Sequence, residues 1–235
     1  YQAPANNKFL SRAGSSAISF LHPAARDKNL LFAGAWYWGT NMGIELLRRD
    51  NDGFWQPAGK LTGFDDFVQS MVEDDQSRLW VSTNKPVVYR LSFPDWPSLE
   101  SPLVETFDIA PGLSGNIPFQ VSFVDGQLVS TSDHGIFVWN ENEQRFQRDQ
   151  RFGEEAAHIV PDLDGRFWVL SKGRRHLRMA TPRADGSYQI DQARFQTLAN
   201  KKIHHIHPSA DGDLVWFSTF EGLIRYDRRI QSSSS

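Results

Sequence analysis

The chain contains no cysteine among its 235 residues. This absence excludes disulfide bonds, thiol nucleophiles and cysteine-ligated metal sites. It leaves the cellular compartment open, because many periplasmic proteins also lack cysteine. No run of about 18 apolar residues occurs either, so the sequence predicts no membrane-spanning helix.

The chain also lacks a strong excess of charge. Its 25 basic residues nearly balance 28 acidic ones, and the net charge of −3 gives no basis for predicting nucleic-acid or membrane partners. Residues 1–8 lack an initiator methionine and the apolar stretch of a signal peptide, so we interpret the chain as mature or trimmed. We interpret residues 1–231 as a single domain and the serine run 232–235 as a tail or linker.

What the sequence does contain is a repeat of short apolar runs separated by tight polar turns. Aromatic residues make up 13% of the chain, which favours sheet packing because flat rings fit a pleated surface. Three copies are clear, at residues 71–83 (MVEDDQSRLWVST), 159–171 (IVPDLDGRFWVLS) and 206–219 (IHPSADGDLVWFST). Two weaker copies lie at residues 121–131 and 30–34.

One bulky residue marks the second run of each copy, and these anchors align at regular intervals. They are Phe32, Trp80, Leu128, Trp168 and Trp216, and successive positions differ by 48, 48, 40 and 48 residues. A period of roughly 40–50 residues containing several short strands is typical of propeller blades. We therefore predict an all-β protein, a β-propeller of five four-stranded blades.

Turn residues support this interpretation. Asp125-Gly126, Asp164-Gly165 and Asp211-Gly212 each separate two apolar runs, as expected of tight hairpins. The fifth unit ends after three predicted strands, and residues 8–11 supply a spare strand near the N-terminus. We expect that strand to complete the fifth blade and close the ring, which would remove exposed sheet edges. The alternative is a segment of a larger propeller.

The repeat resembles the two-component regulator propeller repeat. Residues 111–118 (PGLSGNIP) are similar to the start of the family's unit, and residues 80–83, 135–139 and 216–227 to its later part. The resemblance implies an extracytoplasmic, in most cases periplasmic, sensor region of a hybrid histidine kinase or a related signalling protein. It implies no catalytic residue, because the repeat residues of the family are structural.

On a propeller, ligands usually meet the loops at one end of the blades. The most suggestive of these loops contains Trp36, Tyr37 and Trp38, followed by Asn41. Three consecutive aromatic residues cannot all face one side of a strand, so at least one points to solvent or to a neighbouring blade. An exposed ring there would stack on a sugar, and the alternative is packing between the first two blades.

A basic lip is a second candidate. Lys85, Lys172, Arg174 and Arg175 lie in loops of the same kind. Together they would bind an anionic ligand such as an acidic sugar or a phosphate, because guanidinium groups suit such anions. The alternative is a set of solvated loop tips.

Acidic pairs form a third candidate. Asp65-Asp66 and the pair at 154–155 lie in loops between blades, and two carboxylates on opposite faces of a sugar can hydrolyse a glycosidic bond. Neighbours on an extended chain point apart, so a working pair would have to come from different blades. The remaining candidate residues of the predicted surface are Asp133, His134, Phe220 and Glu221.

The run from 202 to 207 (KIHHIH) invites a metal interpretation. His205 and His207 would share one face of a strand, and His158 from the fourth blade is a candidate third ligand. Ordinary hydrogen-bonded histidines are the alternative. We predict no metal and no cofactor.

These observations favour a sensor or scaffold propeller that binds a carbohydrate-like small ligand without turnover, with self-association or a receptor as its partner. One alternative is a glycan-processing enzyme that uses Asp65, Asp66, Asp133 or Glu221. The other is a scaffold for protein–protein interaction.

Overall fold

The computed structural model describes residues 17–36, 43–110, 112, 119–199, 201–209 and 211–231. Nineteen short strands account for most of them. The first two blades contain β1 (Ala17–Pro23), β2 (Leu30–Trp36), β3 (Gly43–Arg49), β4 (Trp55–Lys60), β5 (Ser70–Glu73), β6 (Leu79–Ser82), β7 (Val87–Ser92) and β8 (Leu103–Asp108). The others contain β9 (Gln120–Val124), β10 (Gln127–Ser132), β11 (Gly135–Asn140), β12 (Arg145–Arg148), β13 (Ala156–Pro161), β14 (Phe167–Ser171), β15 (Leu177–Pro182), β16 (Tyr188–Asp191), β17 (Ile203–Pro208), β18 (Leu214–Thr219) and β19 (Gly222–Asp227).

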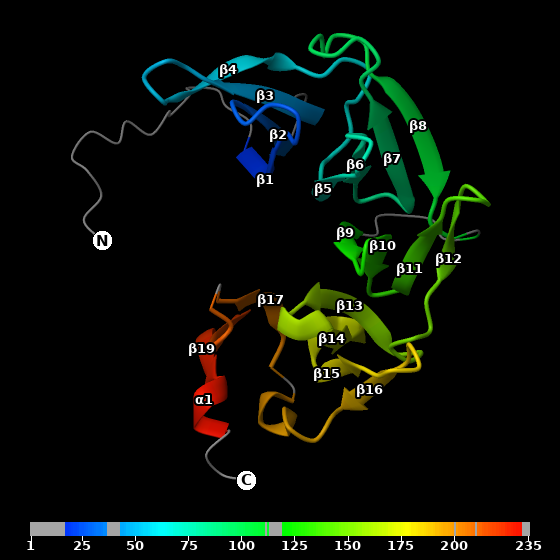
Figure 1. Ribbon diagram of the computed structural model, residues 1–235, viewed down its shortest axis with the longest axis vertical. Coiled ribbons are helices and arrows are strands. Elements are labelled where there is room, and N and C mark those ends of the chain that lie inside the picture. Colours follow the sequence, from blue (N-terminus) through cyan, green and yellow to red (C-terminus); the bar gives the residue numbers. More distant parts are fainter. Residues whose placement is uncertain are drawn as a thin grey trace.

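The strands form five antiparallel sheets in which each strand pairs with its neighbours in the sequence. The sheets follow one another around a centre, with the first strand of each blade innermost (Figure 1). The predicted five-bladed β-propeller is thereby confirmed. The fifth blade has three strands among the described residues, and the strand predicted at 8–11 lies outside them, as does the serine tail.

Helices are few and short. The described residues contain three 3₁₀ turns, η1 (Leu163–Gly165), η2 (Lys172–Arg174) and η3 (Gln196–Leu198), and one four-residue helix, α1 (Arg228–Gln231). In this part of the chain no helix has the length and apolarity needed to cross a membrane.

The hydrophobic core is divided among the interfaces between blades. Each of four apolar clusters joins one blade to the next: the first to the second, the second to the third, the third to the fourth and the fourth to the fifth. Sheets of three or four strands cannot enclose a core alone, so each blade buries its apolar side chains against its neighbours.

The second strand of an interior blade shows how this works. Along β14, Phe167 and Val169 belong to the cluster with the third blade, whereas Trp168 and Leu170 belong to the cluster with the fifth. Successive side chains of a strand point to opposite faces, so all five residues of β14 are buried. In β18 only alternate residues are buried, because the described chain covers one face of the fifth blade.

The predicted anchors occupy equivalent second strands, with one shift of register. Phe32, Trp80 and Trp168 all face the next blade, and Trp216 lies on the corresponding side of β18, where it is 38% exposed. Leu128 packs instead toward the second blade, and its neighbour Val129 faces the fourth. The alignment is therefore wrong by one residue in the third blade.

The Asp-Gly turns behave in two ways. Asp125 and Gly126 have φ angles of 49° and 73° and connect β9 directly to β10, which is the two-residue hairpin that the sequence predicts. The turn at 164–165 differs, because the connection there spans five residues, 162–166, and forms the 3₁₀ turn η1.

We predict that Trp168→Ala lowers the free energy of unfolding by about 3–5 kcal/mol, because it removes a fully buried ring between two blades. Trp216→Ala removes a ring that is exposed on one side and should cost about 1 kcal/mol or less. Urea denaturation measures both values. Equal losses in the two variants would contradict the division of the core described above.

Candidate functional site

Strand direction decides which loops meet. Strands alternate in direction within each sheet, so the connections between second and third strands lie at the same end as the linkers between blades. The described members of this set include β6–β7, β10–β11, β14–β15 and β18–β19. The described loop candidates of the sequence analysis belong to this loop end.

Side chains from the third, fourth and fifth blades converge there. We refer to Asp133, His158, Arg174, His204 and Phe220 as the central loop cluster. Asp133 Oδ1 lies 3.2 Å from His158 Nε2 and accepts a hydrogen bond from the Gly173 amide at 3.3 Å. Arg174 Nη1 donates to the His204 carbonyl oxygen at 3.0 Å, which links the β14–β15 loop to β17.

Local backbone features present these groups. His158 follows an irregularity in the pairing of β13 with β14, where the register shifts between Ala156 and His158. Arg174 has a φ of 57°, a left-handed conformation that is uncommon for residues with a side chain. Such conformations cluster at functional sites, where the surrounding contacts hold them.

The electrostatics of the cluster favour a neutral imidazole. Burial, together with the positive charge of Arg174, lowers the pKa of His158 to about 4, against the opposing effect of Asp133. With Nε2 donating to the Asp133 carboxylate, Nδ1 is a free acceptor, and it is buried without a hydrogen-bond partner. Burial also lowers the pKa of Arg174. The cluster thus contains a positioned acceptor beside a partly desolvated cation.

The fifth blade adds an aromatic surface to the cluster. Phe220, in the β18–β19 turn, is 79% exposed, and its ring lies edge-on to His204 with centroids 4.2 Å apart. Lys202 Nζ lies 5.7 Å from the centre of the same ring. An exposed ring beside hydrogen-bonding groups offers both kinds of contact that a sugar uses, an apolar face and polar partners.

The acidic and basic candidates are paired in other places. Asp65 binds Lys60 with 2.6 Å between Oδ1 and Nζ, and Asp66 binds Lys85 at 2.5 Å and accepts from the Tyr89 hydroxyl. These pairs belong to the loops before and within the second blade. The structure therefore places Lys85 against Asp66 and not beside the arginines of the fourth blade.

The structure describes most of the remaining loop candidates. Glu221 binds Lys201 Nζ at 2.6 Å. His134 and Arg175 are exposed, and Lys172 is the first residue of η2. Trp36 ends β2 and pairs with Ala17, whereas Tyr37, Trp38 and Asn41 lie outside the described residues.

The three histidines proposed as weak metal candidates do not form a site. His205 and His207 are exposed on β17, and His158 is buried against Asp133. In the described part of the chain no group of three or more His, Cys, Asp or Glu side chains could hold a metal ion. The alternation of β17 was predicted correctly, but its exposed face does not meet His158.

Sequence reasoning missed two residues. His204 was assigned no role, although its carbonyl holds Arg174 and its buried Nε2 has no partner. Arg178 in β15, outside the central loop cluster, was also assigned no role, although a charged residue between Leu177 and Met179 in a buried strand is itself a signal.

Comparison with known proteins adds a sequence match at the second blade. Residues 62–85, which include β5 and β6, match the family model described as two component regulator propeller. The chain carries a two-component regulator propeller repeat. The resemblance predicted from the sequence is thereby confirmed, and the regulator propeller repeat lies where one of the clearest copies was found. No curated protein matches the chain significantly.

Several solved structures share the fold of this chain. Extracellular domains of two candidate hybrid two-component systems from B. thetaiotaomicron are each 18% identical, with TM-scores of 0.59 and 0.57. The chain is covered over 91% and 92% of its length, and it spans 30% and 28% of those domains. A candidate 6-phosphogluconolactonase from Bacteroides fragilis is 15% identical, with a TM-score of 0.59 and coverage of 93% and 69%. At these identities the likeness shows the fold.

We predict that the stability of the protein depends on His158 below neutral pH. The His158 imidazole has a pKa of 6.5 in the unfolded chain, whereas burial lowers its pKa to about 4 in the folded protein. Stability is therefore lost as pH falls from 6.5 toward 4, by about 2 kcal/mol at pH 5, and changes no further below pH 4.

Urea denaturation of wild type and His158→Gln at about pH 7 and about pH 5 measures this contribution. The variant should lose less stability than wild type between the two pH values. His207→Gln, which removes an exposed imidazole from β17, is the matched control. Equal losses in wild type and His158→Gln would contradict the prediction.

Proposed function

We propose that this chain is a ligand-sensing propeller of an extracytoplasmic signalling receptor and that it binds a carbohydrate-like small ligand without turnover. The regulator propeller repeat at residues 62–85 and the likeness to extracellular domains of hybrid two-component systems support a role in signalling. The chain spans less than a third of those domains. The role of the whole receptor is therefore part of the proposal.

The central loop cluster is the observation that carries the binding part of the proposal. His158 offers an acceptor at Nδ1, Arg174 offers a cation, and Phe220 offers an exposed ring. Because these groups come from the fourth and fifth blades, a ligand bound among them would be sensitive to the relative positions of the two blades. That sensitivity is what a sensor requires.

The pairing of the acidic residues supports binding without turnover. A glycosidase needs two carboxylates that face one substrate. Here Asp65, Asp66 and Glu221 each pair with a different lysine, and Asp133 is bonded to His158. Each of these four carboxylates is therefore held by a partner of its own.

Calorimetric titration with a panel of neutral and acidic oligosaccharides, combined with product analysis, tests this proposal. We expect saturable binding to at least one oligosaccharide and no released product. Phe220→Ala and Asp133→Asn should each weaken binding about tenfold, because the first removes the stacking surface and the second releases His158 and Gly173.

Glu143→Gln is the matched control, because Glu143 is exposed in the β11–β12 connection at the opposite end of β11. It should bind as wild type does. If product is released and Asp133→Asn abolishes this release, the protein is an enzyme and the proposal of a sensor without turnover is wrong.

A scaffold role is the second candidate, and one observation favours it. Trp216 and Leu223 are 38% and 71% exposed on the outer face of the fifth blade, where an apolar partner would cover them. Binding of a protein partner that is lost in Leu223→Ser, with no response to any oligosaccharide, would favour this function over the first.

A further inference from the structure

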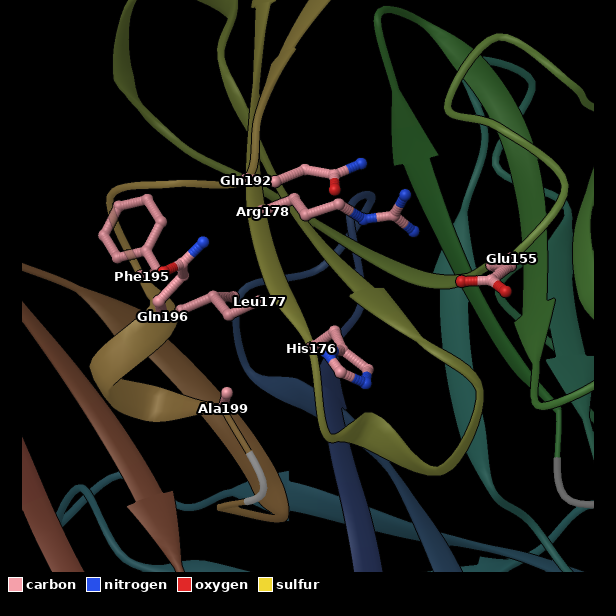
Figure 2. A pocket seen from close by; sticks show the side chains of 8 residues that line it. All are labelled: Glu155, His176, Leu177, Arg178, Gln192, Phe195, Gln196 and Ala199. Atoms are coloured by element: carbon pink, nitrogen blue, oxygen red, sulfur yellow. The ribbon is translucent and has the colours of Figure 1, made fainter.

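A separate cavity lies beside the fourth blade. Its volume is about 290 Å³, close to the lower end of the usual range for small-molecule sites, so it suits a compact ligand. Three segments form it: the linker before β13, the start of β15, and the β16–β17 connection that contains η3. The lining residues are Glu155, His176, Leu177, Arg178, Gln192, Phe195, Gln196 and Ala199 (Figure 2).

Arg178 is the unusual member of this lining. Its neighbours Leu177 and Met179 pack into the apolar cluster between the fourth and fifth blades, so Arg178 points to the other face of β15. The residue is only 9% exposed, and its Nε and Nη2 atoms are buried without a hydrogen-bond partner. Arginine is almost never buried unless it is paired, so this position calls for a partner that the described chain does not supply.

The surroundings of Arg178 are polar but do not bind it. Figure 2 shows its guanidinium group and the amide of Gln192 extending to the same side of the cavity, toward Glu155. Burial lowers the pKa of Arg178, and the charge of Glu155 opposes this effect from a distance. The structure describes no ion pair between the two, and the side chain of Glu155 is on an exposed linker.

We infer that this cavity is a binding site for a compact carboxylate, such as a sugar acid or a hydroxy acid, and that Arg178 holds the carboxylate group. The Nε–Nη2 edge of a guanidinium presents two parallel N–H donors at the spacing of the two carboxylate oxygens. Both donors lack partners here, so a carboxylate would satisfy them together.

Arg178 lines the cavity, and no hydrogen bond described in the structure fixes its guanidinium group. Gln192 and Gln196 are exposed and line the same space, and their amides can bind hydroxyl groups next to the carboxylate. Buried Phe195 closes one wall, since its ring packs against Trp168 and Tyr226.

This inference goes beyond the proposed function, because the cavity lies outside the central loop cluster and needs no signalling partner. It also assigns a role to Glu155. A carboxylate ligand near Arg178 would meet a like charge there, so Glu155 lowers the affinity for any anion in the cavity. Removing that charge should tighten binding.

Calorimetric titration of the full chain with D-glucuronate, D-glucose and L-lactate tests the inference. Glucuronate and glucose differ only in the carboxylate, and lactate separates a hydroxy acid from a sugar acid. We expect binding of at least one carboxylate and none of glucose. Arg178→Met should weaken that binding at least tenfold, and Arg178→Lys should also weaken it, because lysine keeps the charge but loses the two parallel donors.

Glu155→Gln is expected to tighten the same binding several-fold. The matched control is Arg183→Gln, which removes an exposed arginine near the β15–β16 turn of the same blade and should leave the affinity unchanged. Asp133→Asn should also bind the carboxylate as wild type does, which separates this site from the central loop cluster.

Thermal unfolding without ligand distinguishes a binding role of Arg178 from a structural one. If Arg178 stabilised the fold, its replacement would lower the unfolding temperature. Replacing an unpaired buried cation by an apolar side chain of similar length is neutral or stabilising, so Arg178→Met should unfold at the same or a higher temperature. The inference is overturned if no carboxylate binds at millimolar concentration. It is also overturned if binding is lost in Asp133→Asn and kept in Arg178→Met, or if both Arg178 variants unfold at markedly lower temperature.

Discussion

Apolar packing between successive blades is the constraint on which the rest of this structure depends. No blade encloses a core, and the four hydrophobic clusters lie at the four interfaces between consecutive blades. An interior strand such as β14 therefore has to be apolar on both faces, which is why FWVLS is buried throughout. The same requirement holds the sheets in a fixed order around the centre, and so it fixes which loops meet at one end.

Polar residues in such strands conflict with this requirement. His158 lies in the innermost strand of the fourth blade and Arg178 in its third strand, and both are more than nine-tenths buried. Each has a polar atom without a partner in the described chain. Buried polar groups are usually satisfied, so these exceptions are better indicators of a site than the exposed charges of the loops.

Much of the fold could be predicted because each blade repeats the same short pattern of apolar runs and turn residues. The second strand of the second blade, Leu79–Ser82, contains the predicted anchor Trp80, and Asp125-Gly126 forms the expected hairpin. Register was harder. Leu128 and Val129 are both apolar and both buried, so spacing alone could not show which of them faces the fourth blade.

The sites were harder to predict than the fold, because pairing depends on which residues distant in sequence come together. Lys85 and the arginines of the fourth blade look alike in the sequence, yet Asp66 binds the first and the His204 carbonyl binds Arg174. Arg178 needed the opposite reasoning. Its position between two core residues was visible in the sequence, but only the structure shows that its buried Nε and Nη2 atoms have no hydrogen-bond partner in the described chain.

The one-sided burial of β18 has a consequence for how the molecule opens. Within the part of the chain that the structure describes, interior blades adhere to two neighbours and the fifth blade to one. Cohesion in such an array is a sum over nearest neighbours, as in stacked-repeat proteins, so a terminal member detaches at lower free energy than an interior one. For the described residues taken alone, amide hydrogens of β17 to β19 are therefore expected to exchange with solvent faster than those of β13 to β15.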